Sequence, residues 1–198
     1  MKIARAAIAT AIYLSILVAV HLVHVRLLSV NVVFYAAIAD CIVAVIAAGA
    51  VLVAGQYFRA LGAFEKTQLL LIWILIGYAL AISVPTVIDR SLSFYILEKL
   101  EQRGGGIRLD RFDEVFTREY LKEHRLVDVR LTEQVESGTV TIADGCVRLT
   151  PKGSVIASFS RAYRRNFLPR HRLLMGTYTD DLTDPFRNSA KAPDYLCR

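Results

Sequence analysis

One ionisable residue, Asp40, lies inside the second of three long apolar stretches in this 198-residue chain. A charged carboxylate is costly inside a membrane unless it is paired. Asp40 therefore predicts either a proton or ion relay, or a carboxylate that is neutral or hydrogen-bonded within a helix bundle or to a partner subunit. A single acid without a polar track favours the second interpretation. Counting helical rise from the loops brings Tyr13 or Ser15, and Tyr78 or Ser83, to the same depth.

Two histidines, His21 and His24, share a helix face near the end of the first apolar stretch. An interfacial position explains them better than a metal site, because no third ligand is near them in the sequence. The sequence has no GxSxG, HExxH or Walker motif, and the triple glycine at 104–106 lacks the GK[ST] of a phosphate loop, so it predicts a helix stop. We therefore expect no catalytic residue, no cofactor and no metal, and a chain that is not an enzyme.

The three cysteines have neither metal spacing nor a paired framework. Cys41 falls in an apolar stretch, Cys146 in a predicted hairpin and Cys197 close to the end of the chain. This pattern predicts free thiols in a reducing compartment.

The elements that position these residues are three predicted membrane spans at residues 6–23, 32–53 and 69–88. Each is long enough for the ~20 residues that cross a hydrocarbon layer of ~30 Å. Residues 1–88 carry only five Lys/Arg and two acidic residues, whereas residues 89–198 carry nineteen and sixteen. With 55% hydrophobic residues and a mean hydropathy of +0.42, the chain has too little polar surface to bury these stretches in a soluble core. The first stretch lacks a small-x-small cleavage site and predicts an uncleaved anchor.

The second span is rich in small residues, among them Ala44, Ala48, Ala50 and Ala54 at four-residue spacing. Such spacing lets helix backbones approach closely in lipid, so this span is expected in the middle of the bundle or against a partner's helix. The positive-inside rule does not decide the orientation, because four basic residues flank the spans on one side and five on the other. They are Lys2, Arg5, Arg59 and Lys66 against Arg26, Arg90, Lys99, Arg103 and Arg108.

The sequence after the third span predicts a small soluble domain at residues 89–167 and an extended tail at 168–198. Its expected elements are an amphipathic helix from Leu92 to the triple glycine, a short extended link at 107–109, and a helix capped by Asp110. A helix at about 125–137, a hairpin through Ala143-Asp144-Gly145 and a helix after Thr150-Pro151 follow. We expect the apolar residues of the last two helices to point inward: Val127, Leu131, Val135, Val155, Ile156, Phe159 and Tyr163.

This order, together with Val135-Glu136-Ser137-Gly138 and the run Cys146-Val147-Arg148-Leu149-Thr150-Pro151-Lys152-Gly153, resembles the winged-helix superfamily over about residues 90–167. The resemblance implies a fold class of three transmembrane helices plus a small α+β winged-helix-like soluble domain. Winged-helix regulators place the helix at 125–137 in the major groove of DNA. Here the outward face carries two carboxylates, which phosphates would repel, and a protein partner fits it better. That face comprises Arg125, Val129, Thr132, Glu133 and Glu136.

Basic residues gather in the second half of the last predicted helix and in the residues just after it, and two interpretations of them stay open. They could hold anionic lipid headgroups, at about 1 kcal/mol for each residue near the surface, or they could form a solvated face and a basic turn. The residues are Arg161, Arg164, Arg165, Arg170 and Arg172.

Three functions are compatible with this organisation. The first is a non-catalytic accessory or scaffold subunit of a bacterial-type inner-membrane assembly, whose membrane-proximal domain docks partners. The expected partners are membrane lipid and a larger membrane protein or a second copy, with nucleic acid disfavoured. The second is a membrane-tethered winged-helix regulator of transcription, and the third is a small transporter or sensor that uses Asp40. We expect a multi-pass protein of the inner (plasma) membrane with its C-terminal domain in the cytoplasm, since a winged-helix fold with unpaired cysteines suits that compartment.

Overall fold

The computed structural model describes residues 2–187, 189 and 197. Its contacts divide the chain into two compact units, Met1–Val127 and Asp128–Arg198. The division falls inside the predicted winged-helix region, about forty residues after the composition break at Ile88/Asp89. We describe each unit by itself.

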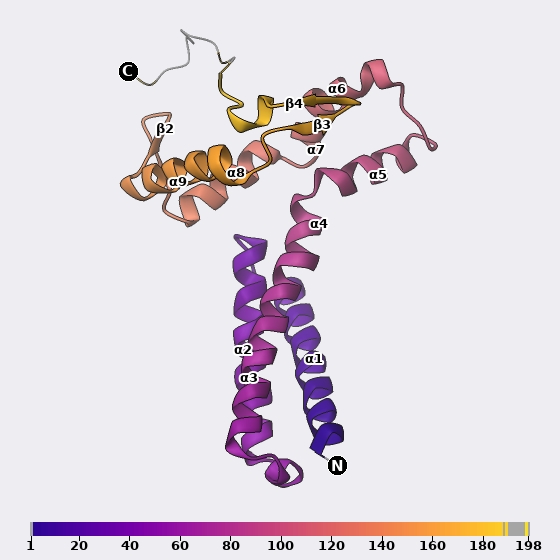
Figure 1. Cartoon of the computed structure of the whole chain (residues 1–198), viewed down its shortest axis with the longest axis vertical. Coiled ribbons are helices and arrows are strands. Elements are labelled where there is room, and N and C mark those ends of the chain that lie inside the picture. Colours follow the sequence, from indigo (N-terminus) through magenta and orange to yellow (C-terminus); the bar gives the residue numbers. More distant parts are fainter. Residues whose placement is uncertain (1, 188, 190–196, 198) are drawn as a thin grey trace. The chain divides into compact units, whose positions relative to one another are not determined.

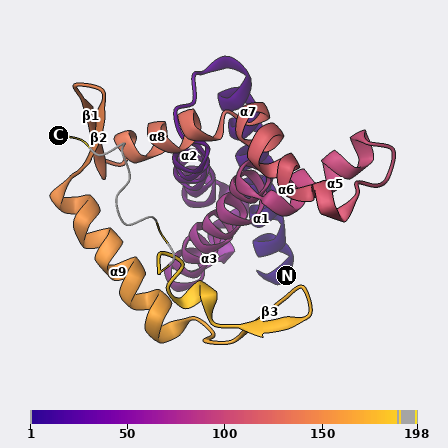
Figure 2. The same cartoon turned by 90° about the horizontal axis from the view of Figure 1, so that it is seen from above.

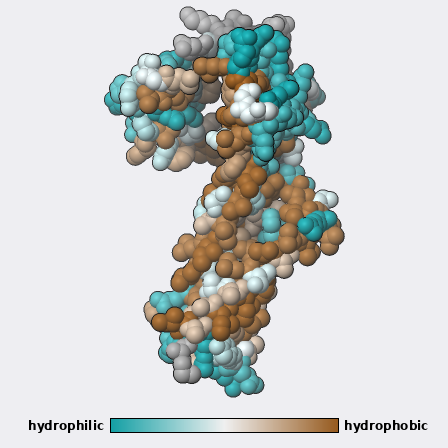
Figure 3. Space-filling model, turned by 90° about the vertical axis from the view of Figure 1, so that its right-hand side faces the viewer, coloured by the Kyte–Doolittle hydropathy of each residue, from teal (hydrophilic) through white to brown (hydrophobic). Residues whose placement is uncertain are grey.

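The first unit contains three helices that are long and apolar enough to span a membrane, as the sequence predicts. They are α1 (Lys2–Leu27), α2 (Val33–Ala54) and a composite helix over Ala63–Arg90, built from α3 (Ala63–Ala81), η2 (Ile82–Thr86) and α4 (Val87–Arg90). A short helix, η1 (Gln56–Ala60), joins the second to the third. The three helices run side by side (Figure 1), and hydrophobic residues dominate their surface (Figure 3). The chain is thus mostly helical, with a multi-pass membrane character.

Helix α2 lies in the middle of this bundle because its small residues let both neighbours approach. Seven of its residues are buried, against three in α1. Ala44 and Ala48 are almost inaccessible, and a Cβ added at Gly49 would lie 3.1 Å from Leu70 Cδ2. The central position predicted from the small residues is confirmed through Ala44 and Ala48, whereas Ala50 and Ala54 are exposed.

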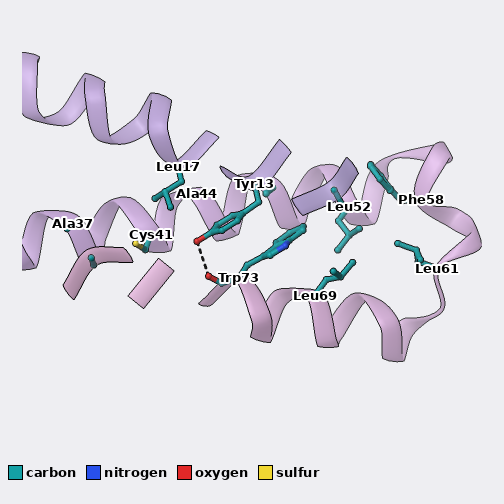
Figure 4. Packing of buried hydrophobic residues seen from close by; sticks show 13 residues of the cluster. Tyr13, Leu17, Ala37, Cys41, Ala44, Leu52, Phe58, Leu61, Leu69 and Trp73 are labelled. Carbon is teal, nitrogen blue, oxygen red and sulfur yellow. Dashed lines mark hydrogen bonds between the residues drawn. The ribbon is translucent and has the colours of Figure 1, made fainter. Parts of the chain in front are cut away.

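The core of the bundle is organised around an aromatic pair (Figure 4). The rings of Tyr13 and Trp73 stack with centroids 5.2 Å apart and planes 3° apart. The Tyr13 hydroxyl donates to the Trp73 carbonyl at 2.9 Å, and Trp73 Nε1 donates to Thr10 Oγ1 at 3.1 Å. Gly77 makes room for this pair, since a Cβ there would lie 2.6 Å from the Tyr13 hydroxyl oxygen. Every polar atom of the pair is therefore satisfied, as apolar surroundings require.

The third helix is interrupted by a π-helical turn, η2, that contains Pro85. Proline has no N–H to donate, which leaves backbone carbonyls of the preceding turn without their usual partner. The Thr86 hydroxyl takes over at the Ala81 carbonyl, four residues before Pro85, to which its Oγ1 donates at 2.7 Å. The Ser83 Oγ donates to the Ala79 carbonyl at 2.6 Å, which also accepts from the Ile82 N–H. Hydroxyl groups commonly repair proline breaks in membrane helices in this way.

The first unit continues outside the spans as a helical hairpin. Helix α5 (Leu92–Gln102) ends at the triple glycine as predicted, with Gly104 at φ 79°. The short helical turns that follow pack back against α5, where Tyr95, Val115 and Tyr120 form a small core. These turns are η3 (Leu109–Arg111), α6 (Phe112–Glu114), η4 (Val115–Tyr120) and α7 (Leu121–Glu123).

One expectation holds in part in this hairpin and another fails. The link at 107–109 is extended at Arg108, as predicted, but it joins no sheet among the described elements and Leu109 already begins η3. Asp110 does not cap a helix, because its carboxylate is held by the Arg108 guanidinium at 2.6–3.0 Å.

The described residues of the second unit form two α-helices, two hairpins and one short 3-10 helix. Helix α8 (Leu126–Glu136) starts two residues before the unit boundary and is followed by β1 (Val140–Ala143), β2 (Cys146–Leu149) and α9 (Pro151–Phe167). Antiparallel β1 and β2 pair in the register Val140↔Leu149, with Asp144 and Gly145 at positive φ in the turn. Thr150 caps α9 by accepting from the Gly153 amide at 3.0 Å, and the hairpin lies at that end of α9 (Figure 2). These elements stand where the sequence predicts them.

The segment after α9 is folded through residue 187, contrary to the extended tail expected at 168–198. Strands β3 (Arg172–Leu174) and β4 (Thr177–Thr179) form a second hairpin, which turns at Met175 and Gly176. A short helix, η5 (Asp181–Thr183), follows, and the Arg187 guanidinium binds the carboxylates of Asp180 and Asp181 at 2.8 and 2.5 Å. The sequence lacked a visible period here because three-residue strands are too short to show one. Of the predicted tail, residues 188, 190–196 and 198 lie outside the described residues.

The cysteine prediction is wrong for two of the three cysteines, because Cys146 and Cys197 form a disulfide. Cys41 is a free, buried thiol, as predicted. The sequence separation of 51 between the paired cysteines hid the pairing, since connectivity at that separation cannot be read from sequence.

The inward-facing residues expected on the last two helices are not buried. Val127 and Val135 of α8 are 60% and 43% exposed, and α8 contains no buried residue. On α9, Val155, Ile156, Phe159 and Tyr163 are all exposed. The winged-helix resemblance placed these residues in a core, and no such core forms around them within the described part of this unit.

Candidate functional site

Asp40 is the centre of the one polar cluster that joins α1 to α2 by side-chain hydrogen bonds among the described residues. It is buried, with 3% of its side chain exposed. Its Oδ2 lies 2.8 Å from His21 Nδ1, and its Oδ1 lies 2.5 Å from His24 Nδ1. Each carboxylate oxygen therefore faces one imidazole, and the two imidazoles come from the last turns of α1.

More than one arrangement of protons is compatible with these two contacts. A carboxylate between two neutral imidazoles carries one negative charge, which is costly in hydrocarbon. One added proton makes the cluster neutral, whether it sits on the carboxyl group or on an imidazole. In either neutral arrangement both Nδ1–oxygen contacts stay hydrogen-bonded, one imidazole presents an Nε2–H donor, and the other presents an Nε2 lone pair.

The sequence identified Asp40 but not its partners. Depth counting predicted Tyr13 or Ser15, whereas Tyr13 bonds to the Trp73 carbonyl and the histidines bind Asp40. The histidines were assigned to the membrane interface because α1 was expected to end at Val23. The helix continues to Leu27, which places them inside the span at three-residue spacing on the face toward α2. The structural interpretation of Asp40, a carboxylate hydrogen-bonded within its own bundle, agrees with this geometry.

Two pockets flank the cluster, and each is lined by one of the histidines. His21 lines a pocket of about 550 Å³ between α1, α2 and the segment from Leu80 to Asp89. His24 lines a second pocket of about 470 Å³ between α1 and α2. Within the described residues no group of three or more His, Cys, Asp or Glu side chains could hold a metal ion.

A second polar cluster lies in the helical hairpin outside the spans. Lys99 Nζ lies 2.6 Å from both Glu119 Oε2 and Glu123 Oε1, and only 4% of the lysine side chain is exposed. The Tyr95 hydroxyl donates to Glu123 Oε2 at 2.8 Å, and Arg103 donates to Glu119 at 2.9 Å. These hydrogen bonds fasten α5 to η4 and α7.

The pKa values in this second cluster shift in the directions that keep the lysine and the two carboxylates charged. Hydrogen bonds to Glu119 and Glu123 raise the pKa of Lys99, and the lysine lowers the pKa of both carboxyl groups. Burial, followed by the hydrogen bond to Glu123, raises the pKa of Tyr95 to about 12. Every charge here has a partner, so the cluster reads as a structural fastening.

The predicted partner-binding face of α8 remains largely exposed. Val129 is 36% exposed and Glu136 is exposed, whereas Arg125 precedes the helix at φ 44°. Glu133 is drawn back onto the helix by an ion pair with Arg130 at 2.6 Å, which leaves 11% of its side chain accessible. Acidic residues thus still mark this face, but they are already engaged in interactions.

The five predicted arginines lie on three consecutive segments of the chain. Three lie on α9, Arg170 lies in the link after it and Arg172 lies in β3. Arg165 is paired with Asp184 at 3.1 Å. At 100° per residue, Arg161, Arg164 and Arg165 fall on the side of α9 opposite to its apolar residues.

An uncovered apolar stripe on α9 is the feature that sequence reasoning missed. Val155, Phe159, Tyr163 and Phe167 recur every four residues, and their exposed fractions run from 46% to 73%. The rings of Phe159, Tyr163 and Phe167 follow one another at 6.0 and 5.2 Å. The spacing was visible in the sequence, but it was taken to indicate a core. We call these four residues the α9 stripe.

Comparison with known proteins adds no family to this description. No family model, no curated protein and no solved structure matches the chain.

Proposed function

We propose that this chain is a non-catalytic accessory or scaffold subunit of a larger inner-membrane assembly. Its three helices would hold it in the membrane, and the α9 stripe would dock a protein partner. The observation that carries the proposal is the exposure of the stripe: four large apolar side chains lie on one side of a helix that has no acidic residue. Contiguous apolar surface of this kind on a part outside the spans is typical of an interaction site.

The chemistry of the stripe indicates the kind of partner. Its aromatic residues are of the type enriched at the centres of protein interfaces. Lys152 and the three arginines make the rest of α9 cationic. We therefore infer a partner with an apolar groove rimmed by carboxylates, into which the helix would lie along its i, i+4 anchors.

The alternative of a membrane-tethered winged-helix regulator has less support. Asp128, Glu133 and Glu136 give α8 an acidic character that works against docking on phosphates. A gel-shift titration of the full chain in detergent against duplex DNA separates the two. Salt-sensitive binding with a sequence preference would overturn the accessory role.

The third candidate, a transporter or sensor, depends on Asp40. Asp40→Asn keeps one hydrogen-bonding oxygen but removes the ionisable group. If the protein is an accessory subunit, this variant should assemble normally with its partner. A loss of transport or sensing with assembly intact would favour the third candidate.

The disulfide changes the proposed orientation. Cytoplasmic placement of the C-terminal part rested partly on unpaired cysteines, and Cys146–Cys197 removes that support. Disulfides persist in oxidising compartments and are rare in the cytosol. We therefore place the C-terminal part on the oxidising side, with Lys2 and Arg5 in the cytoplasm. A membrane-impermeant maleimide should label the thiols of intact cells only after an impermeant reductant is added; labelling without reductant would contradict the pairing.

Site-specific photo-crosslinking tests the docking proposal. A benzoyl-phenylalanine at Phe159 should give one dominant protein adduct in intact membranes, whereas the same probe at Ala157, exposed on the opposite side of α9, should not. The adduct should disappear in a Phe167→Ser background, because the stripe binds as a unit. Equal adducts at both positions, or none at Phe159, would overturn the proposal.

A further inference from the structure

The pocket beside Asp40 lies wholly within the spanning helices. Nine of its thirteen lining residues are Ala, Val, Leu, Ile or Pro, and the other four are His21, Asp40, Cys41 and Asp89. Its wall on the third helix runs from the end of α3 to α4 and includes the π-helical turn, where Val84 and Pro85 line the cavity. A volume of about 550 Å³ is within the range of small-molecule sites, which are mostly apolar with a few polar groups that fix orientation.

His21 is the polar group that is oriented for a ligand. Its Nδ1 is engaged by Asp40, and within the described residues no hydrogen bond reaches its Nε2. A carboxylate that fixes one imidazole nitrogen sets the ring orientation and leaves the other nitrogen to act. The His21 side chain is one-third exposed, and it lines this pocket.

The charges around the pocket limit the polar head of a ligand. Asp89, at the end of α4, would repel an anionic head. Asp40 is occupied by two imidazoles and offers no free counter-ion to a cationic head at His21, so the lining carboxylate that could attract a cation is Asp89, at the end of α4. No lysine or arginine lines the cavity. An uncharged oxygen, which can donate to or accept from an imidazole Nε2, meets none of these penalties.

We propose that this pocket binds a lipid-soluble molecule with an uncharged hydroxyl or carbonyl head, hydrogen-bonded to His21 Nε2. The apolar body of the molecule lies against Leu17, Val84 and Ile88. This binding site is independent of the partner proposed for α9. The same chemistry is found in a neutral membrane lipid and in a lipid-soluble quinone, and the experiment distinguishes the two sources.

The test is photolabelling of the purified full chain in nanodiscs with three sixteen-carbon probes that carry a diazirine. The probes differ only in the head: an alcohol, an amine or a carboxylic acid. The alcohol should label best, with adducts mapped to the α1 and η2 residues of the pocket. Stronger labelling by the amine or the acid, or adducts spread evenly over the spans, would overturn the proposal.

Variants separate the pocket from the head-group contact. Val84→Trp fills the cavity and should abolish alcohol labelling, whereas Val53→Trp, on the exposed surface of α2, should not change it. His21→Leu should weaken binding about three- to tenfold, the value of one hydrogen bond. His24→Leu, which removes the other partner of Asp40 but not the pocket contact, is the matched control. Equal loss in both histidine variants would contradict a specific head-group contact.

Competition identifies the source of the ligand. Unlabelled diacylglycerol and a decyl-substituted benzoquinone are added separately to the alcohol probe. Displacement by either supports the proposal and names the source, and displacement by neither overturns it.

Discussion

The three-helix bundle and the second unit differ in how far they bury their apolar side chains. In the bundle, small residues and one aromatic pair are buried tightly, and the large aliphatic side chains left outside are those that lipid would cover. In the second unit only Thr139 and Gly153 are buried among residues 128–187, 189 and 197. Its large apolar residues are exposed without a membrane span to account for them.

The difference teaches where each part obtains its stability. A membrane bundle gains little from sequestering leucine away from lipid, so close packing and satisfied polar groups hold it together. The second unit is held by its hairpins, the cap of α9 and the disulfide, and it buries almost no core. A unit with so little core is expected to rely on a partner.

The largest loss of stability is expected from a substitution at the centre of the bundle. Trp73→Ala removes a fully buried ring that stacks on Tyr13, and it should destabilise the bundle by about 3–5 kcal/mol. Leu75→Ala, on the exposed side of the same helix, is the control and should have little effect. Unfolding by a denaturing detergent, followed by circular dichroism, measures both. Equal losses would mean that the bundle does not depend on its packed centre.

A smaller loss of stability is expected where Gly77 packs closely against side chains of α1 and α2. Gly77→Ala places a Cβ 2.6 Å from the Tyr13 hydroxyl oxygen and 3.0 Å from Cys41 Cβ. Overpacking of this kind costs about 1–3 kcal/mol. The same unfolding assay applies, with Ala79→Val on the exposed side as the comparison. A neutral Gly77→Ala would show that the bundle packs more loosely than its geometry requires.

The Lys99 cluster tests whether satisfied polar groups also stabilise the first unit outside the spans. The pKa values of Glu119 and Glu123 are lowered in the folded protein, so their contribution is present above the ordinary carboxyl pKa of about 4.3 and is lost as pH falls through the lowered values. The melting temperature of the helical hairpin that contains α5 should therefore fall when the pH is lowered from 7 to 3. Lys99→Met should flatten this dependence, and an unchanged pH profile would exclude the cluster as its source.

The smallest effect on stability is expected in the second unit. Phe159→Ser removes a ring that is 68% exposed, so the free energy of unfolding should change by less than about 0.5 kcal/mol, while co-purification of the partner is lost. Ala157→Ser is the matched control and should change neither quantity. A large loss of stability would mean that Phe159 already lies in a core, and the contrast between the two parts would fail.

Local patterns predicted the elements well. Apolar length gave the three spans, the triple glycine ended α5, Asp144-Gly145 turned the hairpin, and Thr150-Pro151 started α9. The small residues of α2 also predicted its central position. These features depend on residues that are neighbours along the chain or along one helix.

Contacts between distant segments were not predictable in the same way. His21 and His24 became partners of Asp40 only because α1 extends beyond Val23, and helix ends in apolar sequence carry weak boundary markers. The α9 stripe has the same spacing whether a core or a partner covers it, so the pattern alone could not distinguish them. Whether the order of elements makes a winged helix stays a prediction.

The Cys146–Cys197 bond has a practical consequence for any protease that reaches this part of the chain. Because the bond closes a covalent loop, one cut at a peptide bond between residues 147 and 196 opens that loop without releasing a fragment. The cleaved chain would migrate near its intact size on a gel until a reductant separates it into two pieces. A single nick there can therefore go undetected under oxidising conditions.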